Sequence, residues 1–313
     1  MNAKFVVVAA LAVVSIAAPL TSRAATLQVA CDNPSSKLPT INSALKLLDS
    51  LIGNLGPNTI NVSGACNENI VIDDKANLTI NAQNGASITD ASAGTKAVID
   101  VERTTDFHLN GFAIRGGGGT FNTAILCIWN STCYFSNNNV RHPSGVGIGA
   151  FLGAAIALDH DVVEQSGTGL AVISGSRANA IAATIRNNTN NGVNVFASSF
   201  FNAVGPTTVA NNGGDGFFVW QHSQVLLSGT AITGNGSIGV FANEQSDVNF
   251  FVGGNTISGN GIGVAVQDMS WAGFFDGATV VSGSANPPDI NCWGAHSGAR
   301  LTAANGTTNC PQP

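Results

Sequence analysis

Two carboxylates in the C-terminal part of the chain, Glu244 and Asp268, are candidates for chemistry because they lie 24 residues apart. The same interval recurs through the neighbouring sequence. If it corresponds to one lap of a coiled backbone, the two residues are about 5 Å apart at the backbone. Such a pair suits a retaining glycosidase or two ligands of a Ca²⁺ ion. His222 lies nearby and is a candidate for substrate binding. The alternative, for all three residues, is a solvated place in a turn.

A third candidate acid is Asp215, which begins an Asp-Gly-Phe tripeptide. The tripeptide resembles part of the polygalacturonase catalytic motif, and the resemblance implies a catalytic Asp215. The rest of that motif is missing, since the corresponding positions hold Asn191, Ile238 and Ile262. An isolated Asp-Gly is first of all a turn signal. Asp215 also lies six positions before the register of Glu244, too far along a strand to partner it.

A set of outward aromatic residues is the second candidate site. Gly-apolar-x-apolar segments recur along the chain, and strand alternation turns their intervening residues outward. The outward residues include the rings and amides Asn194, Phe196, Phe218, Trp220, Phe241, Asn243 and Gln267. Rings bordered by amides predict a platform for sugars, since exposed apolar patches usually mark interaction surfaces. The alternative is that a long turn buries the rings.

These candidates are placed by a repeat of about 23 residues. The glycines that open the Gly-apolar-x-apolar segments are spaced by 22, 23, 24, 23 and 24 residues, at Gly147, Gly169, Gly192, Gly216, Gly239 and Gly263. Serines keep the same period at Ser176, Ser199, Ser223, Ser246 and Ser270. Apolar residues follow it at Ile185, Val209, Ile232, Ile257 and Val280, and asparagines at Asn187, Asn211, Asn235 and Asn260. Self-similarity of this length predicts a repeat architecture.

Three short strands per period, joined by Gly, Asn and Ser turns, predict one coil of a parallel β-helix. Equivalent residues then stack about 4.8 Å apart. We assign the glycines to turns that need a positive φ and the asparagines to a hydrogen-bonded ladder. The stretch from Asn58 to Ser284 accommodates roughly ten coils. Before it, Thr40–Ile52 has apolar residues at helical spacing, with Thr40 as N-cap and Gly53 past the end, and would close the open end of the stack.

The amphipathic helix followed by NTINVSGACNENIVIDDKANLTI resembles the entry into the pectin-lyase-like right-handed β-helix superfamily, and the later repeats resemble its generic coils. The resemblance implies an all-β, single-stranded, right-handed parallel β-helix with an N-terminal helical cap. It also implies that a site would lie on the sheet built from the Gly-apolar-x-apolar strands. No specific enzyme family is matched.

The first 24 residues have the pattern of a signal peptide: Lys4, an apolar run from Phe5 to Ala18, and small residues before a cleavage site after Ala24. The run is too short to span a bilayer. A secreted or periplasmic product without membrane contact is therefore expected. Loss of Lys4 and Arg23 leaves 10 basic and 18 acidic residues, a formal net charge of −8. This charge disfavours nucleic acid as a partner.

Six cysteines in an exported chain predict disulfides. Local closure favours the pairs Cys31–Cys66 at the N-terminal end, Cys127–Cys133 on a loop and Cys292–Cys310 at the C-terminal end. The spacings do not match zinc sites, and no metal or other cofactor is expected.

The predicted organisation is a signal peptide at 1–24, an N-terminal cap with a helix at 25–57, a parallel β-helix at 58–284 and a C-terminal cap at 285–313. The predicted function is glycan binding on the aromatic surface. No Lys or Arg occurs between residues 192 and 281, so a neutral polysaccharide is expected rather than a polyuronate. The alternative is a polysaccharide-degrading enzyme, more readily a glycoside hydrolase than a lyase, that uses Glu244 and Asp268.

Overall fold

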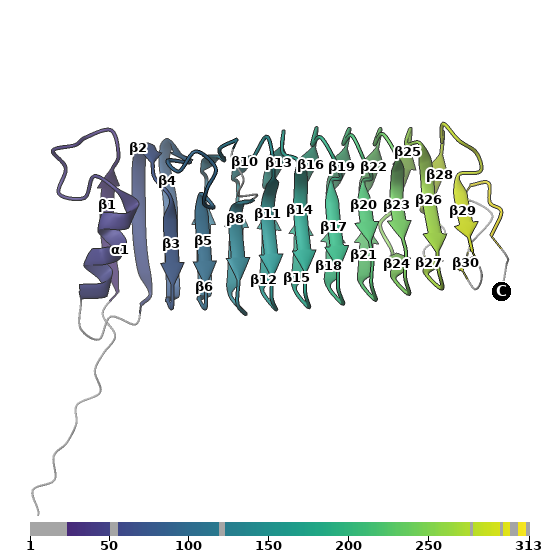
Figure 1. The fold of residues 1–313 in the computed structure, drawn as a ribbon, viewed down its shortest axis with the longest axis horizontal. Coiled ribbons are helices and arrows are strands. Elements are labelled where there is room, and N and C mark those ends of the chain that lie inside the picture. Colours follow the sequence, from purple (N-terminus) through teal and green to yellow (C-terminus); the bar gives the residue numbers. More distant parts are fainter. Residues whose placement is uncertain are drawn as a thin grey trace, which may run out of the picture.

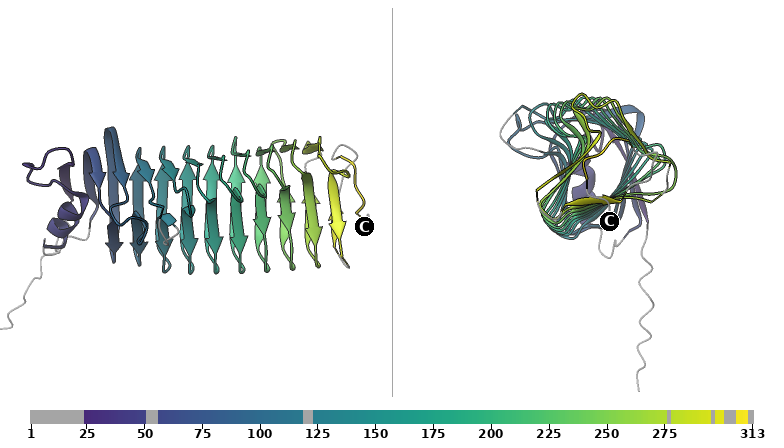
Figure 2. Two further views of the ribbon diagram at one scale, coloured as in Figure 1. Left: turned by 45° about the horizontal axis from the view of Figure 1, so that its top comes forward. Right: turned by 90° about the vertical axis from the view of Figure 1, so that its right-hand side faces the viewer.

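The computed structural model describes residues 24–50, 56–118, 123–275, 278–294, 297–300 and 306–310 of the 313-residue chain. The backbone forms a parallel β-helix whose coils stack along the long axis of the molecule (Figure 1). Seen end-on, successive coils superimpose (Figure 2). Each coil contributes one short strand to each of three faces, which confirms the predicted architecture.

The first face is a ten-stranded sheet, in agreement with the predicted number of coils. It contains β3 (Ile70–Asp73), β5 (Ile99–Glu102), β8 (Thr123–Ile128), β11 (Val146–Phe151), β14 (Thr168–Ile173), β17 (Val193–Phe196), β20 (Phe217–Val219), β23 (Ile238–Ala242), β26 (Ile262–Gln267) and β29 (Ile290–Trp293).

The second and third faces are joined at one end because the long strands β2 (Asn58–Asn67) and β4 (Ala76–Thr89) run through both. The second face also contains β1 (Ala25–Ala30), β6 (Thr105–Asn110), β9 (Thr132–Ser136), β12 (Ala155–Asp159), β15 (Arg177–Ile181), β18 (Phe200–Val204), β21 (Gln224–Ser228), β24 (Asp247–Phe250), β27 (Trp271–Phe274) and β30 (Gly298–Arg300). The third face also contains β7 (Ala113–Arg115), β10 (Asn139–Arg141), β13 (Val162–Glu164), β16 (Thr184–Arg186), β19 (Thr208–Ala210), β22 (Ala231–Thr233), β25 (Thr256–Ser258) and β28 (Val280–Ser282).

The two ends of the chain relate to the predicted segments as follows. Residues 1–23 of the predicted signal peptide lie outside the described residues. Strand β1 falls in the segment assigned to the N-terminal cap and pairs with β2. Strands β29 and β30 fall in the segment assigned to the C-terminal cap and continue the first and second faces. In the described part of the chain, no helix has the length and apolar character that a bilayer crossing needs.

The helix α1 (Ile41–Ser50) covers the N-terminal end of the stack and buries Ile41, Ala44, Leu45 and Leu48. The predicted N-cap is confirmed, because Thr40 Oγ1 accepts a hydrogen bond from the Ser43 amide at 3.0 Å. The predicted end of the helix at Ile52 and Gly53 lies outside the described residues.

A second cap of this helix comes from the first coil. The buried carboxylate of Glu68 accepts hydrogen bonds from the Ile41 amide at 2.7 Å and the Asn42 amide at 3.0 Å. It also accepts one from Asn42 Nδ2 at 2.7 Å. A carboxylate at a helix N-terminus satisfies amides that have no partner within the helix and complements the helix dipole.

Glu68→Gln is therefore expected to lower the free energy of unfolding by about 2 kcal/mol, because one carboxylate oxygen becomes an NH₂ group that faces a buried N–H. Urea unfolding followed by circular dichroism measures the effect. The matched control is Glu244→Gln at an exposed turn, where no change is expected. Equal stability of Glu68→Gln and the wild type would show that the cap is unimportant.

Buried polar ladders run along the corners between faces. The predicted serine column is present: the amides of Ser199, Ser223 and Ser246 each donate to the hydroxyl of the next serine at 3.1–3.2 Å. The asparagine ladder is formed by Asn188, Asn212, Asn235 and Asn260, with Nδ2–Oδ1 distances of 2.9 Å.

Three details of the predicted columns need correction. Asn187 and Asn211 are exposed turn residues with φ of 55°, and the ladder uses the residues that follow them. The apolar column continues from Ile257 to the buried Val281, while Val280 points outward. The pair Cys127–Cys133 is not on a loop, because it joins β8 to β9 within the core, where both cysteines are buried. The other two disulfides are Cys31–Cys66 and Cys292–Cys310, as predicted.

The recurring glycines also have a different role from the predicted one. None of the six has a positive φ. Instead, their missing side chain allows close approach between coils. A Cβ built on Gly192 would lie 2.8 Å from the carbonyl oxygen of Gly216 and 2.7 Å from Nδ2 of Asn212. Glycine recurs at this position because any side chain would collide with the neighbouring coil.

Candidate functional site

Partly exposed aromatic rings gather on the first face where β17, β20 and β23 pair. The register aligns Asn194 with Phe218 and Phe218 with Phe241, as the repeat predicts. The Phe218 and Phe241 rings are stacked, with centroids 5.5 Å apart and an interplanar angle of 11°. Trp220 is stacked against Phe218 at 6.0 Å. Phe196 meets both Phe218 and Trp220 edge-on, at 5.2 and 5.7 Å.

A fifth ring belongs to this cluster and was not predicted. Trp293 of β29 lies with its centroid 5.9 Å from that of Phe241, at an interplanar angle of 67°. It reaches Phe241 because the residue next to Phe241 in the column is the small Ala265. Sequence reasoning missed Trp293 because this segment lies where the repeat period is lost, and the burial of Ile290–Trp293 does not alternate. We call Phe196, Phe218, Trp220, Phe241 and Trp293 the aromatic cluster.

The aromatic cluster is only partly covered by its surroundings. Each of its rings is partly exposed, and in the described coils no long turn folds over them. Figure 1 shows β17, β20 and β23 uncovered on the near side of the molecule. The predicted alternative of burial under a long turn is therefore wrong for these coils.

Side-chain amides border the rings, as predicted. Asn194 Oδ1 accepts a hydrogen bond from Asn191 Nδ2 at 2.9 Å. Asn243 Oδ1 accepts one from the Glu244 amide at 2.8 Å. Gln267 donates through Nε2 to Asp268 Oδ2 at 3.1 Å. These contacts orient the three amides while leaving further donor and acceptor positions for a ligand.

The carboxylate of Asp215 lies in the turn that precedes β20. It is partly buried, and this burial raises its pKa above the usual range even though the Ser237 side chain and the Ile238 amide donate hydrogen bonds to it. The Ile238 amide is 2.9 Å from Asp215 Oδ1. The Asp215 amide in turn donates to Asn191 Oδ1 at 2.8 Å. Asp215 is therefore integrated into the turns at the start of the first-face strands.

Glu244 and Asp268 lie at the opposite end of these strands, in adjacent turns. Both have left-handed backbone conformations, with φ of 48° and 49°, and both side chains are exposed. The Gln245 amide donates to the Asp268 carbonyl at 3.0 Å, and the His222 amide donates to the Glu244 carbonyl at 3.0 Å. The predicted juxtaposition is thus present at the backbone. His222 is an exposed residue of the same corner, with φ of 59°.

The carboxylates cannot all act together. Asp215 precedes the register position of Glu244 by six residues, which is about 20 Å along a strand. Glycosidase carboxyl pairs are about 5 to 9.5 Å apart. Any acid/base pair on this face would therefore be Glu244 and Asp268, beyond the edge of the aromatic cluster.

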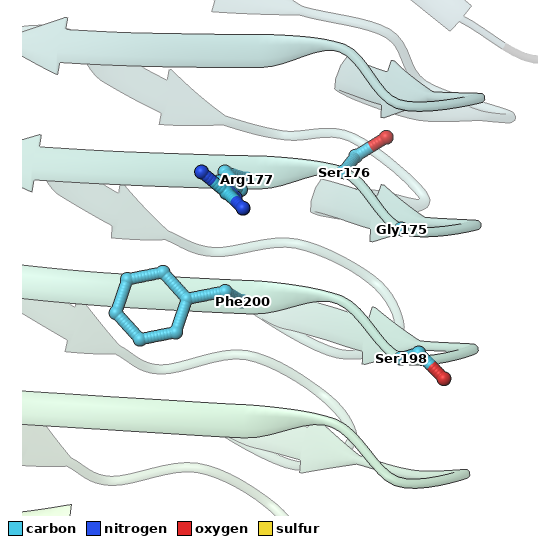
Figure 3. Close-up of a pocket in the computed structure, with 5 residues that line it drawn as sticks. All are labelled: Gly175, Ser176, Arg177, Ser198 and Phe200. Carbon is cyan, nitrogen blue, oxygen red and sulfur yellow. The ribbon is translucent and has the colours of Figure 1, made fainter.

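Two further places in the structure have features of a binding site. A pocket at the corner between the first and second faces is lined by Gly175, Ser176, Arg177, Ser198 and Phe200 (Figure 3). It has no carboxylate or histidine, so it lacks a group for acid/base catalysis.

The one His/Cys/Asp/Glu group among the described residues that is compact enough for a metal is Cys31, Cys66 and Glu68. Its sulfurs are joined in a disulfide and its carboxylate caps α1, so no ligand set is left for a metal.

Comparison with known proteins agrees with this geometry. Residues 123–296, more than half of the chain, match the family described as the right handed beta helix region. The chain belongs to the right-handed β-helix family. All five rings of the aromatic cluster of this β-helix protein lie within the matched residues. No curated protein sequence matches the chain.

Solved structures with the same fold include polysaccharide-active enzymes and a tailspike. A pectate lyase has a TM-score of 0.62 and 13% identity, with 92% of this chain and 81% of that chain covered. The A-module of a mannuronan C-5 epimerase from Azotobacter vinelandii has a TM-score of 0.54 and 12% identity, with 86% and 95% covered. The Dettilon tailspike protein has a TM-score of 0.52 and 11% identity, with 90% and 68% covered. At these identities the similarity establishes the fold.

Proposed function

We propose that this β-helix protein binds a neutral polysaccharide on the aromatic cluster. The observation that carries the proposal is the continuous row of five partly exposed rings bordered by amides. Aromatic rings supply apolar area for the C–H faces of sugars, and amides pair with their hydroxyl groups. Sites of this composition, apolar with a few oriented polar groups, are typical of small-molecule recognition.

The direction of the bound chain follows from the coil spacing. Phe218 and Phe241 are direct register partners, so equivalent positions recur about every 4.8 Å along the axis. A pyranose unit in an extended glycan has a similar length. A polysaccharide lying parallel to the axis would therefore place successive sugars over successive coils, with Trp293 and Phe196 at the two ends of the cluster.

Charge favours a neutral ligand. Residues 192–281 contain no Lys or Arg, whereas Asp215, Glu244 and Asp268 all lie at the edges of this face. An anionic polymer would meet carboxylates without cations to pair with its own, and like charges repel. The pectate and mannuronan named for two of the similar structures are therefore not the expected ligands here.

We further propose that the protein is secreted or periplasmic. Three disulfides bridge the described chain, and disulfides persist in oxidising compartments. The signal-peptide pattern of residues 1–24 supports the same assignment.

Replacing both stacked rings, Phe218→Ala with Phe241→Ala, is expected to weaken glycan binding at least ten-fold, or about 1.4 kcal/mol. The two substitutions remove ring area and its stacking partner together. Affinity electrophoresis in gels containing neutral glycans such as glucans, xylans and mannans measures the change.

The chain offers a matched control on the second face. Phe251 and Phe275 directly follow β24 and β27 of that face, and their exposed rings are also stacked, with centroids 5.3 Å apart and an angle of 16°. Phe251→Ala with Phe275→Ala should leave binding unchanged. Equal losses in both double variants, or unchanged binding in the first, would remove the proposal.

The alternative function is a polysaccharide-degrading enzyme, favoured by the adjacent positions of Glu244 and Asp268. Release of reducing ends from the same glycans, abolished in Glu244→Gln, would support a glycoside hydrolase. Binding without release of reducing ends supports the binding protein. The assay therefore separates the two functions even when Glu244→Gln binds the glycan as tightly as the wild type.

A further inference from the structure

A column of charged residues runs along the outer side of the third face at the ends of β7, β10, β13 and β16. Arg115 is the register partner of Arg141, and Glu164 is the register partner of Arg186. Glu164 also pairs with Arg141 one coil away. We call Arg115, Arg141, Glu164 and Arg186 the arginine column. It carries three positive charges and one negative charge, in a chain with a formal net charge of −6.

Glu164 holds two of the arginines in place. Its side chain is 6% exposed, and its two oxygens accept hydrogen bonds from Arg141, from Asn139 Nδ2 at 3.2 Å and from Arg186 Nε at 3.0 Å. Burial alone would raise the Glu164 pKa, but the hydrogen bonds from Asn139, Arg186 and Arg141 outweigh it and the pKa is lowered. The carboxylate therefore stays ionised and fully engaged, and it does not neutralise Arg115.

Arg115 and Arg141 are thus like charges one coil apart. Arg115 is exposed and forms no ion pair with any residue that the structure describes. Arg141 donates through Nε to Asn139 Oδ1 at 3.1 Å and through one terminal nitrogen to Glu164. Its other terminal nitrogen has no protein acceptor in the described part of the chain. Two guanidinium groups with unused donors repel each other unless an anion lies between them.

The space between them is shaped to admit such an anion. A cleft of about 200 Å³ is lined by Arg115, Gly116, Arg141, Pro143 and Gln165. The lining has two guanidinium groups and one amide, and no acidic residue. The planar fork of arginine matches the oxygens of carboxylate, sulfate and phosphate groups.

We propose that this cleft binds one oxyanion group, either as a free ion or as a sulfate or carboxylate carried by a polymer along the third face. Arg115 and Arg141 contact the oxygens, and Glu164 with Asn139 positions Arg141. The site is independent of the aromatic cluster, because it lies on another face and recognises charge.

Isothermal titration at constant ionic strength, with sodium sulfate, sodium acetate, neutral dextran and dextran sulfate as ligands, tests the proposal. Arg115→Gln is expected to weaken sulfate binding at least ten-fold. The matched control is Arg177→Gln, which removes an exposed arginine of the second face and should leave binding unchanged. Arg115→Lys keeps the charge but loses the fork, and should bind with intermediate affinity. Circular dichroism of each variant verifies the fold.

The choice of ligands distinguishes the two possible sources of the oxyanion group, a free ion and a polymer. Dextran sulfate bound more tightly than sulfate, with the gain lost in Arg115→Gln, assigns the group to a polymer. Equal affinity per sulfate group assigns a free anion, which also supports the site. Absence of binding by sulfate, acetate and dextran sulfate overturns the proposal. Equal weakening in Arg177→Gln and Arg115→Gln also overturns it, because it indicates unspecific attraction to positive charge.

Discussion

Gly216→Ala is expected to destabilise the β-helix by about 3 kcal/mol, a large fraction of the stability of an ordinary domain. A Cβ at this position would lie 2.5 Å from the carbonyl oxygen of Gly239, 2.8 Å from Cγ2 of Ile232 and 2.9 Å from Nδ2 of Asn235. Each of these distances is shorter than van der Waals contact. None of the three atoms can move cheaply, because one is backbone, one belongs to a core residue and one belongs to the buried asparagine ladder.

The effect should spread beyond one coil, since coils of a solenoid are stabilised by their neighbours. Urea unfolding and hydrogen exchange of the flanking coils measure it. Gly118→Ala is the matched control: apart from its chain neighbours, no atom of the residues that the structure describes lies within 4 Å of its added Cβ, and its φ is not positive. We expect that variant to be as stable as the wild type. A Gly216→Ala protein with wild-type stability would contradict the close packing of the glycine column.

The second large effect concerns pH. Asp161 has 0% exposure, and its carboxylate accepts hydrogen bonds from the amide and Nδ2 of Asn138, both at 2.8 Å, and from the Asp159 amide at 3.0 Å. Burial outweighs these three donors and raises the pKa of Asp161 from 3.8 to about 7. The folded protein therefore holds this proton across a pH range in which the unfolded chain has released it.

The consequence for stability has a definite sign. Well below pH 3.8 the group is protonated in both the folded and the unfolded state, so its ionisation does not affect the free energy of unfolding. Between there and about pH 7 the folded state binds more protons than the unfolded state, so stability falls as pH rises. The loss is complete above pH 7 and amounts to roughly 4 kcal/mol at 1.36 kcal/mol per pKa unit.

Urea unfolding of the wild type and Asp161→Asn between pH 4 and 8 tests this prediction. The variant keeps an oxygen acceptor for Asn138 but cannot ionise, so its stability should depend less on pH in this window. Its NH₂ group also faces the Asp159 amide, which lowers stability equally at every pH and leaves the slope unaffected. Asp100→Asn is the comparison, because burial together with Glu102 and Asp73 raises the Asp100 pKa to only about 6. Parallel curves for the wild type and Asp161→Asn would refute the assignment.

The columns of the β-helix could be predicted because parallel pairing leaves little freedom. Once a coil takes about 23 residues, residues one period apart become neighbours about 4.8 Å apart. The adjacency of Phe218 and Phe241, of Glu244 and Asp268, and of the successive serines follows from this constraint. The disulfide pairs could be predicted for a different reason, because each of them joins two cysteines that are close in the sequence.

The predicted columns are displaced by one residue where the length of a turn differs between coils or a strand is short. Asn187 and Asn211 occupy the left-handed turn position that glycine takes at Gly234, so periodicity alone selects the first of two asparagines whereas the ladder uses the second. Val280 and Val281 are both apolar, and only the pairing with Ile257 shows that Val281 is the inward residue. A strand of three residues gives too little alternation to resolve such a slip.

The sequence by itself determined the period, the three strands of each coil and the side of each strand that faces the core, because hydrophobic burial and parallel hydrogen bonding act on local patterns. Only the tertiary structure decided which side chains meet across coils at the surface. Trp293 contacts Phe241 beside the small Ala265. Glu164 forms ion pairs with two arginines, and Asp161 is fully buried. The physical reason is that ring tilt, side-chain reach and burial depend on the neighbours that each residue acquires when the coils stack.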